Sequence, residues 1–402
     1  MEDFKKKIYG DGVRDDYEGI QGLLDSGIST VYLPVPKKHY VISKPLYVHS
    51  NQTLKLDEQT RVVLADNSNC CMLQNADPET GNENIIIDGG IWDMNHNNQW
   101  PNPWHFPRPD TGKIVSYAYL KERYGWTQKS GKLRPEYDGF CFRFCKIVHF
   151  TMKNLTIVNP VVFGVEMGYV SYFTIDNIRF DYTEGSPKLW NMDGIHLEGG
   201  CCYGRITNLK GACHDDLLAL TSTDSLWGPI HDIEVDGIFA ERSHSAVRFL
   251  SRGLPVKNVT IRNVYGSFYV YGIIMSRHVE VEGERGVFEN IVVENFHGSI
   301  CEGTVDVKGN YCALIHIMSG LDMKNITFRN IVREENRCFL PTIKIYKDTN
   351  IDCLVIDGIH QTVAEGNSVI PLQSEASISR LDIKNIFGGV CEINGEQRPD
   401  LN

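Results

Sequence analysis

The sequence lacks any long apolar run, and it lacks an excess of positive charge. No segment approaches the roughly eighteen consecutive apolar residues that a membrane-spanning helix needs. The formal net charge is −11 and no basic stripe interrupts it, which disfavours nucleic acid or an acidic membrane as a partner. The hydrophobic share of 42% and the charged share of 23% are typical of a globular chain with a sizeable core.

The twelve cysteines lack the spacing of a metal site. Several occur as adjacent pairs, Cys70–Cys71 and Cys201–Cys202, or at strand-like positions such as Cys141 and Cys145. No second pair or histidine cluster accompanies them, so a zinc site is not expected. We expect reduced, buried thiols, and no metal or other cofactor.

An apolar signal core is also missing near the first residue. The segment Met1–Ile8 is basic and leads directly into Gly10–Gly12. We therefore expect a cytoplasmic location, or secretion if a signal was removed before the numbering begins.

What the sequence does contain is one short pattern, repeated along most of its length. An apolar and a polar residue alternate, then Asn or Gly occurs, then another apolar residue. Copies lie roughly 23 to 35 residues apart. The nine copies are Met152–Leu155, Ile175–Ile178, Ile206–Leu209, Val235–Ile238, Ile261–Val264, Val293–Phe296, Phe328–Ile331, Ile356–Ile359 and Ile383–Ile386.

This pattern predicts short strands that each turn a corner. Alternation with period two indicates strands, and Asn or Gly tolerates the left-handed backbone of a sharp corner. A β-propeller would need about 40 to 45 residues and four antiparallel strands per unit. The repeat therefore predicts an all-β chain, a single-stranded right-handed parallel β-helix or solenoid. Because a solenoid grows along its axis, we expect one domain over residues 1–402.

The N-terminal residues 1–28 are expected to form a cap. A turn at Asp11–Asp16 precedes an amphipathic helical stretch, Tyr17–Asp25, with a polar face suited to covering the first coil. The strands expected next are Thr30–Leu33, Tyr40–Ile42, Thr53–Leu56 and Arg61–Leu64.

A long aromatic loop insertion, residues 95–134, interrupts the repeat. It is too long for a simple corner. Its rings are Trp100, Trp104, Phe106, Tyr117, Tyr119, Tyr124 and Trp126. These rings either stack on sugar or cover a pocket, or they pack the loop onto the scaffold, and both roles stay open for different rings.

Three carboxylates in the middle coils are the candidates for chemistry. Asp193 lies in Trp190–His196, and about one coil later Asp215 and Asp216 follow His214. Residues one coil apart are separated by about 4.8 Å, so these carboxylates are expected to be neighbours. Inverting glycoside hydrolysis uses one protonated and one ionised carboxyl, roughly 6.5 to 9.5 Å apart. The structural alternative is that they form a turn and a solvated corner.

The motifs around these residues resemble those of the polygalacturonase-like glycoside hydrolases, family 28. Asn191–Gly194 is similar to the Asn-x-Asp-Gly turn of that family, and Asp215–Leu220 to its Gly-Asp-Asp motif with His214 in place of Gly. Ser243–Ser245 looks like Gly-His-Gly with both glycines replaced, and Ile87–Asp93 like an early Asp-Gly-Gly segment. The resemblance covers residues 10 to 390.

The resemblance implies roles for individual residues. It implies Asp215 as general acid, Asp193 and Asp216 as activators of the hydrolytic water, and His244 as the residue that orients the acid. A histidine at an exposed corner is otherwise often only a local hydrogen-bonding residue. Further candidates for substrate binding are Asn191, His214, Trp100 and Trp104.

The chain departs from the fourth motif of the family, Arg-Ile-Lys. The corresponding strand, Tyr271–His278, has apolar or small residues where those cations would hold a galacturonate carboxylate. This departure puts galacturonate in doubt. Arg248 or Arg277 is a candidate for a displaced cation, although either is commonly a solvated strand residue.

Three classes of function remain open at this point. The first is an inverting hydrolase of a pectic or related plant or microbial glycan, exo-acting if the aromatic insertion closes one end of the cleft. The second is a β-helix polysaccharide lyase or uronate epimerase, in which the aspartates serve calcium instead. The third is a non-catalytic carbohydrate-binding or tail-fibre-like protein. In each case the expected partner is an oligo- or polysaccharide.

Overall fold

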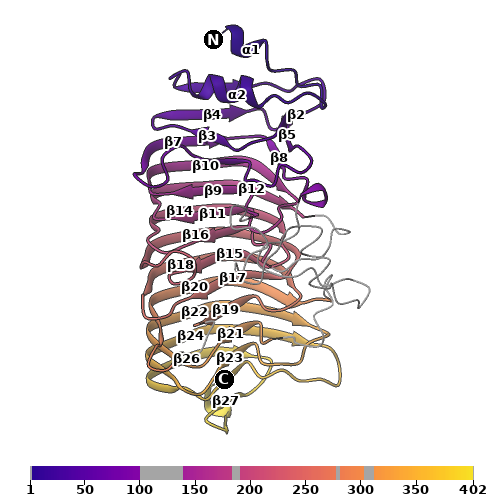
Figure 1. Cartoon of the computed structure of the whole chain (residues 1–402). Coiled ribbons are helices and arrows are strands. Elements are labelled where there is room, and N and C mark those ends of the chain that lie inside the picture. The colour runs from indigo at the N-terminus through magenta and orange to yellow at the C-terminus, as the bar shows by residue number, and fades with distance from the viewer. Residues whose placement is uncertain (1, 100–138, 183–190, 278–280, 303–311, 402) are drawn as a thin grey trace, which may run out of the picture. The chain divides into compact units, whose positions relative to one another are not determined.

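The computed structural model describes residues 2–99, 139–182, 191–277, 281–302 and 312–401. It divides into two compact units. Unit 1 comprises Met1–His196 with Cys213–Asp215, and unit 2 comprises Leu197–Ala212 with Asp216–Asn402. Apart from one antiparallel pair at the C-terminal end, both units consist of parallel strands wound into coils of a right-handed parallel β-helix, which confirms the predicted fold class (Figure 1). The single domain over residues 1–402 stays a prediction.

Unit 1 contains two main sheets. Its first sheet contains β1 (Thr30–Leu33), β4 (Gln52–Leu56), β7 (Asn82–Asp88), β10 (Ile147–Val158) and β12 (Ser171–Asp181). Beside it pair β2 (Tyr40–Ile42), β5 (Arg61–Leu64) and β8 (Ile91–Asp93). The second sheet contains β3 (Leu46–Val48), β6 (Leu73–Asn75), β9 (Phe142–Cys145) and β11 (Val165–Gly168). The helical elements are α1 (Glu2–Lys5), α2 (Tyr17–Leu24) and η1 (His96–Asn98).

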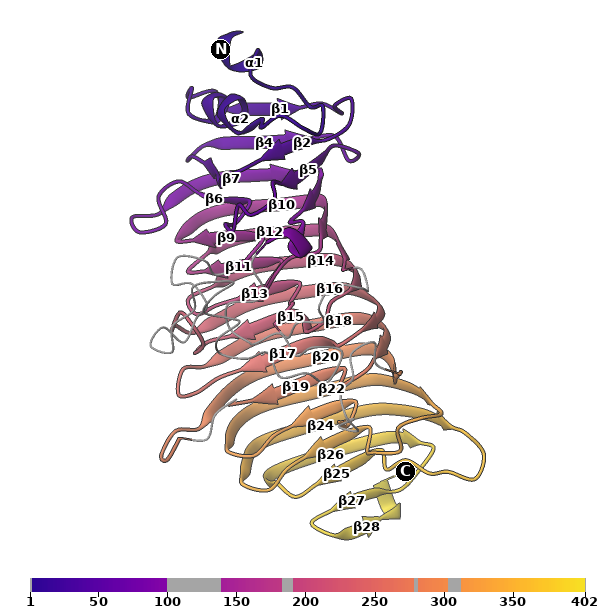
Figure 2. The same ribbon diagram turned by 45° about the vertical axis from the view of Figure 1, so that its right-hand side comes forward.

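Unit 2 repeats the same plan with longer first-sheet strands. These are β14 (Cys202–Ala212), β16 (Ile230–Ser243), β18 (Val256–Phe268), β20 (Gly286–Ile300), β22 (Leu321–Glu335), β24 (Thr349–Val363) and β26 (Ser377–Phe387). The second sheet contains β15 (Asp216–Thr221), β17 (Ser245–Leu250), β19 (Ile273–Ser276), β21 (Ile315–Ile317), β23 (Ile343–Ile345), β25 (Leu372–Ser374), β27 (Cys391–Ile393) and β28 (Glu396–Arg398). Successive strands such as β15, β17 and β19 lie in successive coils (Figure 2). The chain ends in η2 (Pro399–Leu401), and β13 (Ile195–Leu197) contains the boundary between the units.

The N-terminal elements agree closely with the sequence. The predicted helix is α2, which buries Ile20 and Leu24 completely. The four strands predicted after it are β1, β2, β4 and β5, with β4 beginning one residue earlier than expected. Of the predicted insertion 95–134, the part from residue 100 onwards lies outside the described residues, so Trp100 and Trp104 stay predictions. Among the described residues, no helix is both long enough and apolar enough to cross a membrane.

The repeated Asn or Gly turns a corner in every copy. All nine have positive φ, from 50° at Asn330 to 91° at Gly237 and Gly358. The asparagines also bond from coil to coil through their side-chain amides. Asn295 donates to Asn263 at 3.1 Å, and Asn330 donates to Asn295 at 2.9 Å. Where consecutive corners are asparagines, each one therefore helps to fix the register of the next.

A second amide ladder runs through unit 2 outside the repeated pattern. Asn290 donates to Asn258, and Asn325 donates to Asn290, both at 2.8 Å. These three asparagines also have positive φ, from 51° to 55°. The sequence pattern did not single them out, because they lie five residues before the first ladder and share its 32- and 35-residue steps.

The interior is apolar and in register. In unit 2, Ile261 pairs with Val293, which pairs with Phe328, and all three are fully buried. Stacking identical positions in this way buries a continuous core that no single coil could bury alone. All twelve cysteines are free thiols, but only Cys141, Cys201, Cys213, Cys338 and Cys391 are buried, so the expectation of buried thiols is wrong for the other seven.

The first prediction concerns the corner ladder. Asn295→Gly removes two amide hydrogen bonds and keeps a residue suited to positive φ, so it is expected to lower the free energy of unfolding by about 1 kcal/mol. Asn295→Ala adds the left-handed strain and is expected to cost about 2 to 3 kcal/mol. Urea unfolding followed by circular dichroism measures both. Equal costs for the two variants would show that backbone strain at the corner is unimportant.

Candidate active site

In unit 1, the turn Asn191–Gly194 is held from below by buried groups. The Tyr182 hydroxyl donates to the Asp193 carbonyl at 2.8 Å, and the Gly164 amide donates to the same oxygen at 2.8 Å. Burial raises the pKa of the Tyr182 phenol well above its ordinary value, so it remains a donor. Asn191 adopts φ 64°, as a sharp turn requires. The backbone at Asp193 is therefore held in place by contacts that do not involve the Asp193 side chain.

The Asp193 carboxylate is paired with a histidine. Its Oδ2 lies 2.6 Å from His196 Nδ1, and both side chains are 4% exposed. The His196 ring stacks on Phe163 at 4.1 Å, and Phe163 stacks on Phe140 at 4.9 Å. A buried carboxylate is costly unless it is paired. His196 therefore both stabilises Asp193 and sets its direction.

Asp215 lies beside the same turn, as the one-coil spacing predicts. The backbone N–H of Asn191 donates to Asp215 Oδ2 at 3.0 Å. The Asp215 side chain is partly exposed, so part of it reaches solvent. His214, before it, is buried, with its ring 6.4 Å from that of Tyr182. The predicted residues Asn191, Asp193, His214 and Asp215 are thus brought together within unit 1.

In unit 2, Asp216 occupies a different environment from its neighbour in the chain. It is 1% exposed and begins β15. Its Oδ1 accepts hydrogen bonds from the Ser245 hydroxyl at 2.5 Å and from the Tyr271 hydroxyl at 3.0 Å, and Arg248 Nη1 lies 3.6 Å from Oδ2. Donors and a cation favour the ionised form of a carboxylate. All three of these partners of Asp216 lie in unit 2.

His244 packs against the same group. One of its ring nitrogens and an Asp216 oxygen lie within 4.8 Å of each other. The edges of its ring meet Tyr269 and Tyr271, with centroids 5.3 and 5.5 Å away. His244 is 6% exposed, so it is not the exposed corner histidine of the structural alternative. The structure brings His244 to Asp216, as the motif order predicts.

The two candidate cations lie at different places. Arg248, on β17, reaches Asp216. Arg277 lies at the opposite end of the strands from Asp216. Asp216 pairs with Ser245 at the start of β17, whereas Ser276, the residue before Arg277, pairs with Leu250 at the end of β17. There the Arg277 guanidinium donates to the Glu284 carbonyl at 2.9 Å. Arg277 is therefore not brought to Asp216, and Arg248 is the cation beside it.

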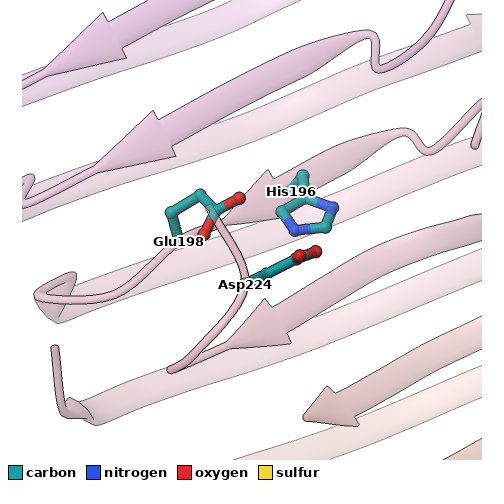
Figure 3. Close-up of side chains that lie close together, drawn as sticks. All are labelled: His196, Glu198 and Asp224. Carbon is teal, nitrogen blue, oxygen red and sulfur yellow. The ribbon is translucent and has the colours of Figure 1, made fainter. Parts of the chain in front are cut away.

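Unit 2 also contains a pair of carboxylates, Glu198 directly after β13 and Asp224 after β15. Oxygens of Glu198 and Asp224 lie within 4.8 Å of each other (Figure 3). Two carboxylates at this distance can share a divalent cation. However, Glu198 Oε2 already accepts the amides of Ser225 and Leu226, at 3.1 and 3.0 Å. These contacts assign Glu198 to fixing the loop after β15.

Several site residues escaped the sequence reasoning. His196 lies within the motif that identified Asp193, and a spacing of three residues was its only signal. Ser245 was seen only as a replaced glycine, although a hydroxyl one coil after Asp216 pairs with it in register. Tyr271 precedes β19, where only missing cations were sought. Tyr182 gave no sequence signal.

The second prediction concerns the Asp193–His196 pair. Asp193→Asn and His196→Ala, measured singly and together by urea unfolding, are expected to show a coupling energy of about 1 to 3 kcal/mol. The reason is that each partner compensates the other in a buried place. The exposed pair Asp25–His49, at 2.8 Å, is the control and is expected to couple by less than about 1 kcal/mol. Equal coupling in the two pairs would contradict a special role for burial.

No protein-family model matches the chain. Rhamnogalacturonase A of Aspergillus aculeatus is 21% identical over 273 residues, which cover 66% of this chain and 56% of the relative. The chain thus spans about half the length of the curated relative that it matches.

Solved structures agree more widely in fold. A family 28 exopolygalacturonase of Yersinia enterocolitica matches with a TM-score of 0.60 at 13% identity, over 96% of this chain and 78% of that chain. An endo-xylogalacturonan hydrolase of Aspergillus tubingensis matches with 0.56 at 14%, over 94% and 97%. The A-module of a mannuronan C-5 epimerase of Azotobacter vinelandii matches with 0.54 at 13%, over 94% and 95%. The chain is therefore similar in fold to family 28 hydrolases and shares their right-handed parallel β-helix, a fold that an epimerase also has.

Proposed function

We propose that this chain is a glycoside hydrolase that cleaves a pectic glycan with inversion at the anomeric carbon. The observation that carries the proposal is the contrast between two consecutive carboxylates. Asp216 is buried and held by Ser245, Tyr271 and Arg248, whereas Asp215 is partly exposed beside the Asn191 turn. Acid–base catalysis of hydrolysis needs two carboxyls in different environments.

The roles are those that the resemblance to the family 28 motifs implies. Asp216 accepts a proton from the attacking water, and Asp193 keeps the water-activating role that its motif implies. Asp215 donates a proton to the glycosidic oxygen as the bond between that oxygen and the anomeric carbon breaks. The water oxygen bonds to the anomeric carbon from the opposite face. His244, which lies close to Asp216 and packs at right angles to Tyr269 and Tyr271, keeps Asp216 in position.

The comparisons support a pectic substrate. The curated relative is a rhamnogalacturonase, and two structures with the same fold are an exopolygalacturonase and a xylogalacturonan hydrolase. These three proteins are named for different pectic substrates, and this chain lacks the cations that the fourth motif would place against a galacturonate carboxylate. We propose a pectic glycan without assigning strict galacturonate specificity. Exo action depends on the insertion at residues 95–134, and the product pattern decides it.

One observation favours a second candidate, a uronate lyase or epimerase. Such enzymes need a Tyr, Lys or Arg near the carboxylate-bearing sugar, and Tyr271 and Arg248 both lie beside Asp216. A lyase forms an unsaturated product that absorbs in the ultraviolet, whereas a hydrolase releases a reducing end without this absorbance. The same digestion therefore separates the two reactions.

The third prediction tests the carboxylates. Asp215→Asn and Asp216→Asn are each expected to lower kcat on the best pectic substrate by about 10² to 10⁴-fold, because each removes a proton-transfer group. Asp382→Asn, an exposed aspartate on β26, is the matched control and should keep full activity. Reducing-end release from homogalacturonan, rhamnogalacturonan and neutral pectic side chains measures the rates. Full activity in Asp215→Asn would refute its role as acid.

The fourth prediction concerns stereochemistry. Proton NMR of the product formed within the first minutes is expected to show the anomer opposite to that of the cleaved bond. Retention of configuration would exclude water activation by Asp216 and would require a covalent intermediate instead.

A further inference from the structure

The second sheet of unit 2 carries a column of outward side chains that continues beyond Arg248. In β21, β23 and β25 the two flanking residues are buried and the middle one is not, so the middle residue points away from the core. The strand register places these middle residues in line. From coil to coil the column contains Arg248, Ile274, His316, Lys344, Gln373 and Glu392.

The Lys344 ammonium can donate one more hydrogen bond than it makes to the protein. Its ammonium donates to Gln373 at 2.8 Å and to Glu375 at 2.6 Å, and its side chain is 13% exposed. An ammonium has three donors, so one remains for another acceptor. The ammonium also lies 5.1 Å from the centre of the Tyr346 ring. Lys344 is thus held in place beside an aromatic face.

His316 adds a polar atom that lacks a protein partner. Its Nδ1 is buried and makes no hydrogen bond. Native proteins rarely leave such an atom unpaired, and a ligand or a water commonly satisfies it. Its ring lies 5.0 Å from that of Tyr346. Burial and the Lys344 charge lower the pKa of His316 to about 4, so the ring is neutral near pH 7.

We propose that His316, Lys344 and Tyr346 form a subsite for an acidic sugar residue of the bound glycan. The Lys344 ammonium and His316 supply donors to its carboxylate, and the exposed Tyr346 ring offers a face to the sugar. The assignment rests on the proposed function, since it takes the ligand to be a glycan lying along this sheet.

The register sets where this subsite lies along the glycan. Lys344 is three coils beyond Arg248, a separation of about 14 Å at about 4.8 Å per coil. The acidic sugar therefore belongs to a residue several units from the bond that is cleaved. In one of the coils between the two cations the column position is Ile274, which is buried against Tyr269 and Tyr271 and offers no charge to the glycan.

Glu375 makes the proposal sharper, because it competes for the same ammonium. Its carboxylate is 44% exposed and accepts from Lys344. Lys344 in turn lowers the pKa of Glu375, which is therefore an anion near pH 7. An incoming carboxylate has to displace it, whereas a neutral sugar does not. Removing the negative charge of Glu375 consequently distinguishes an acidic ligand from a neutral one.

The experiment measures binding by calorimetry at pH 7 with a pentamer of galacturonate and with a neutral galactan pentamer of equal length. Lys344→Met is expected to weaken binding of the acidic pentamer about ten-fold, and Glu375→Gln to tighten it several-fold. Neither change should alter binding of the neutral pentamer. Lys384→Met, which removes an exposed ion pair on β26, is the control and should change neither affinity.

A second readout does not depend on affinity or on folding of the variants. In wild-type protein, the acidic pentamer is expected to raise the pKa of His316 from about 4, since a nearby carboxylate favours the protonated ring. Lys344 on β23 and Tyr346 directly after it lie beside this ring, and the register position on β19 is the apolar Ile274. Proton–nitrogen NMR of the imidazole follows this titration. An unmoved His316 together with unchanged acidic binding in Lys344→Met overturns the subsite.

The failures of the two proposals are distinguishable. If wild-type protein cleaves a pectic glycan while the Lys344 and Glu375 variants bind the acidic pentamer as wild type does, only the subsite is wrong. If wild-type protein cleaves no glycan but the His316 pKa rises with the acidic pentamer, the subsite holds and the hydrolase proposal fails.

Discussion

The hydrogen bond from one corner asparagine to the next is the constraint on which the rest of the structure depends. A parallel β-helix has no hairpin to fix its register, so each coil must be aligned with its neighbour by side chains and by strand pairing. The left-handed asparagines do both: they bend the chain and bond along the axis, as between Asn263, Asn295 and Asn330. The apolar interior then stacks position on position.

Because the register is fixed, residues that are far apart in the sequence lie side by side in adjacent strands. Asp216 meets Ser245 because the two residues are partners in adjacent strands, and Arg248 is close because it lies on the same strand as Ser245. The same alignment continues through His316 and Lys344. Burial then gives two consecutive aspartates opposite surroundings: one is enclosed among donors and one is partly exposed. This asymmetry, and not the number of carboxylates, supports acid–base chemistry.

The sequence predicted what is periodic. Strand positions, the corner residues and the approach of Asp215 to the Asn191 turn all follow from alternation and coil length. It did not predict what depends on side-chain direction at a turn or in a strand without alternation. Tyr271 reaches Asp216 from the turn before β19, and His196 reaches Asp193 from the middle of β13, whose three residues are all buried and show no alternation. The second amide ladder was missed because only one asparagine per coil was sought.

The unequal spacing of the corners, roughly 23 to 35 residues, has a consequence for how such a protein changes. Register is set locally at each asparagine, so residues added between two corners lengthen a loop without shifting the strands on either side. Loop closure costs little for each added residue. A lineage can therefore acquire a new specificity loop in one step, by insertion, while the distance between Asp216 and Ser245 is preserved. In this scaffold the length of a loop can therefore change independently of the register of the strands on either side of it.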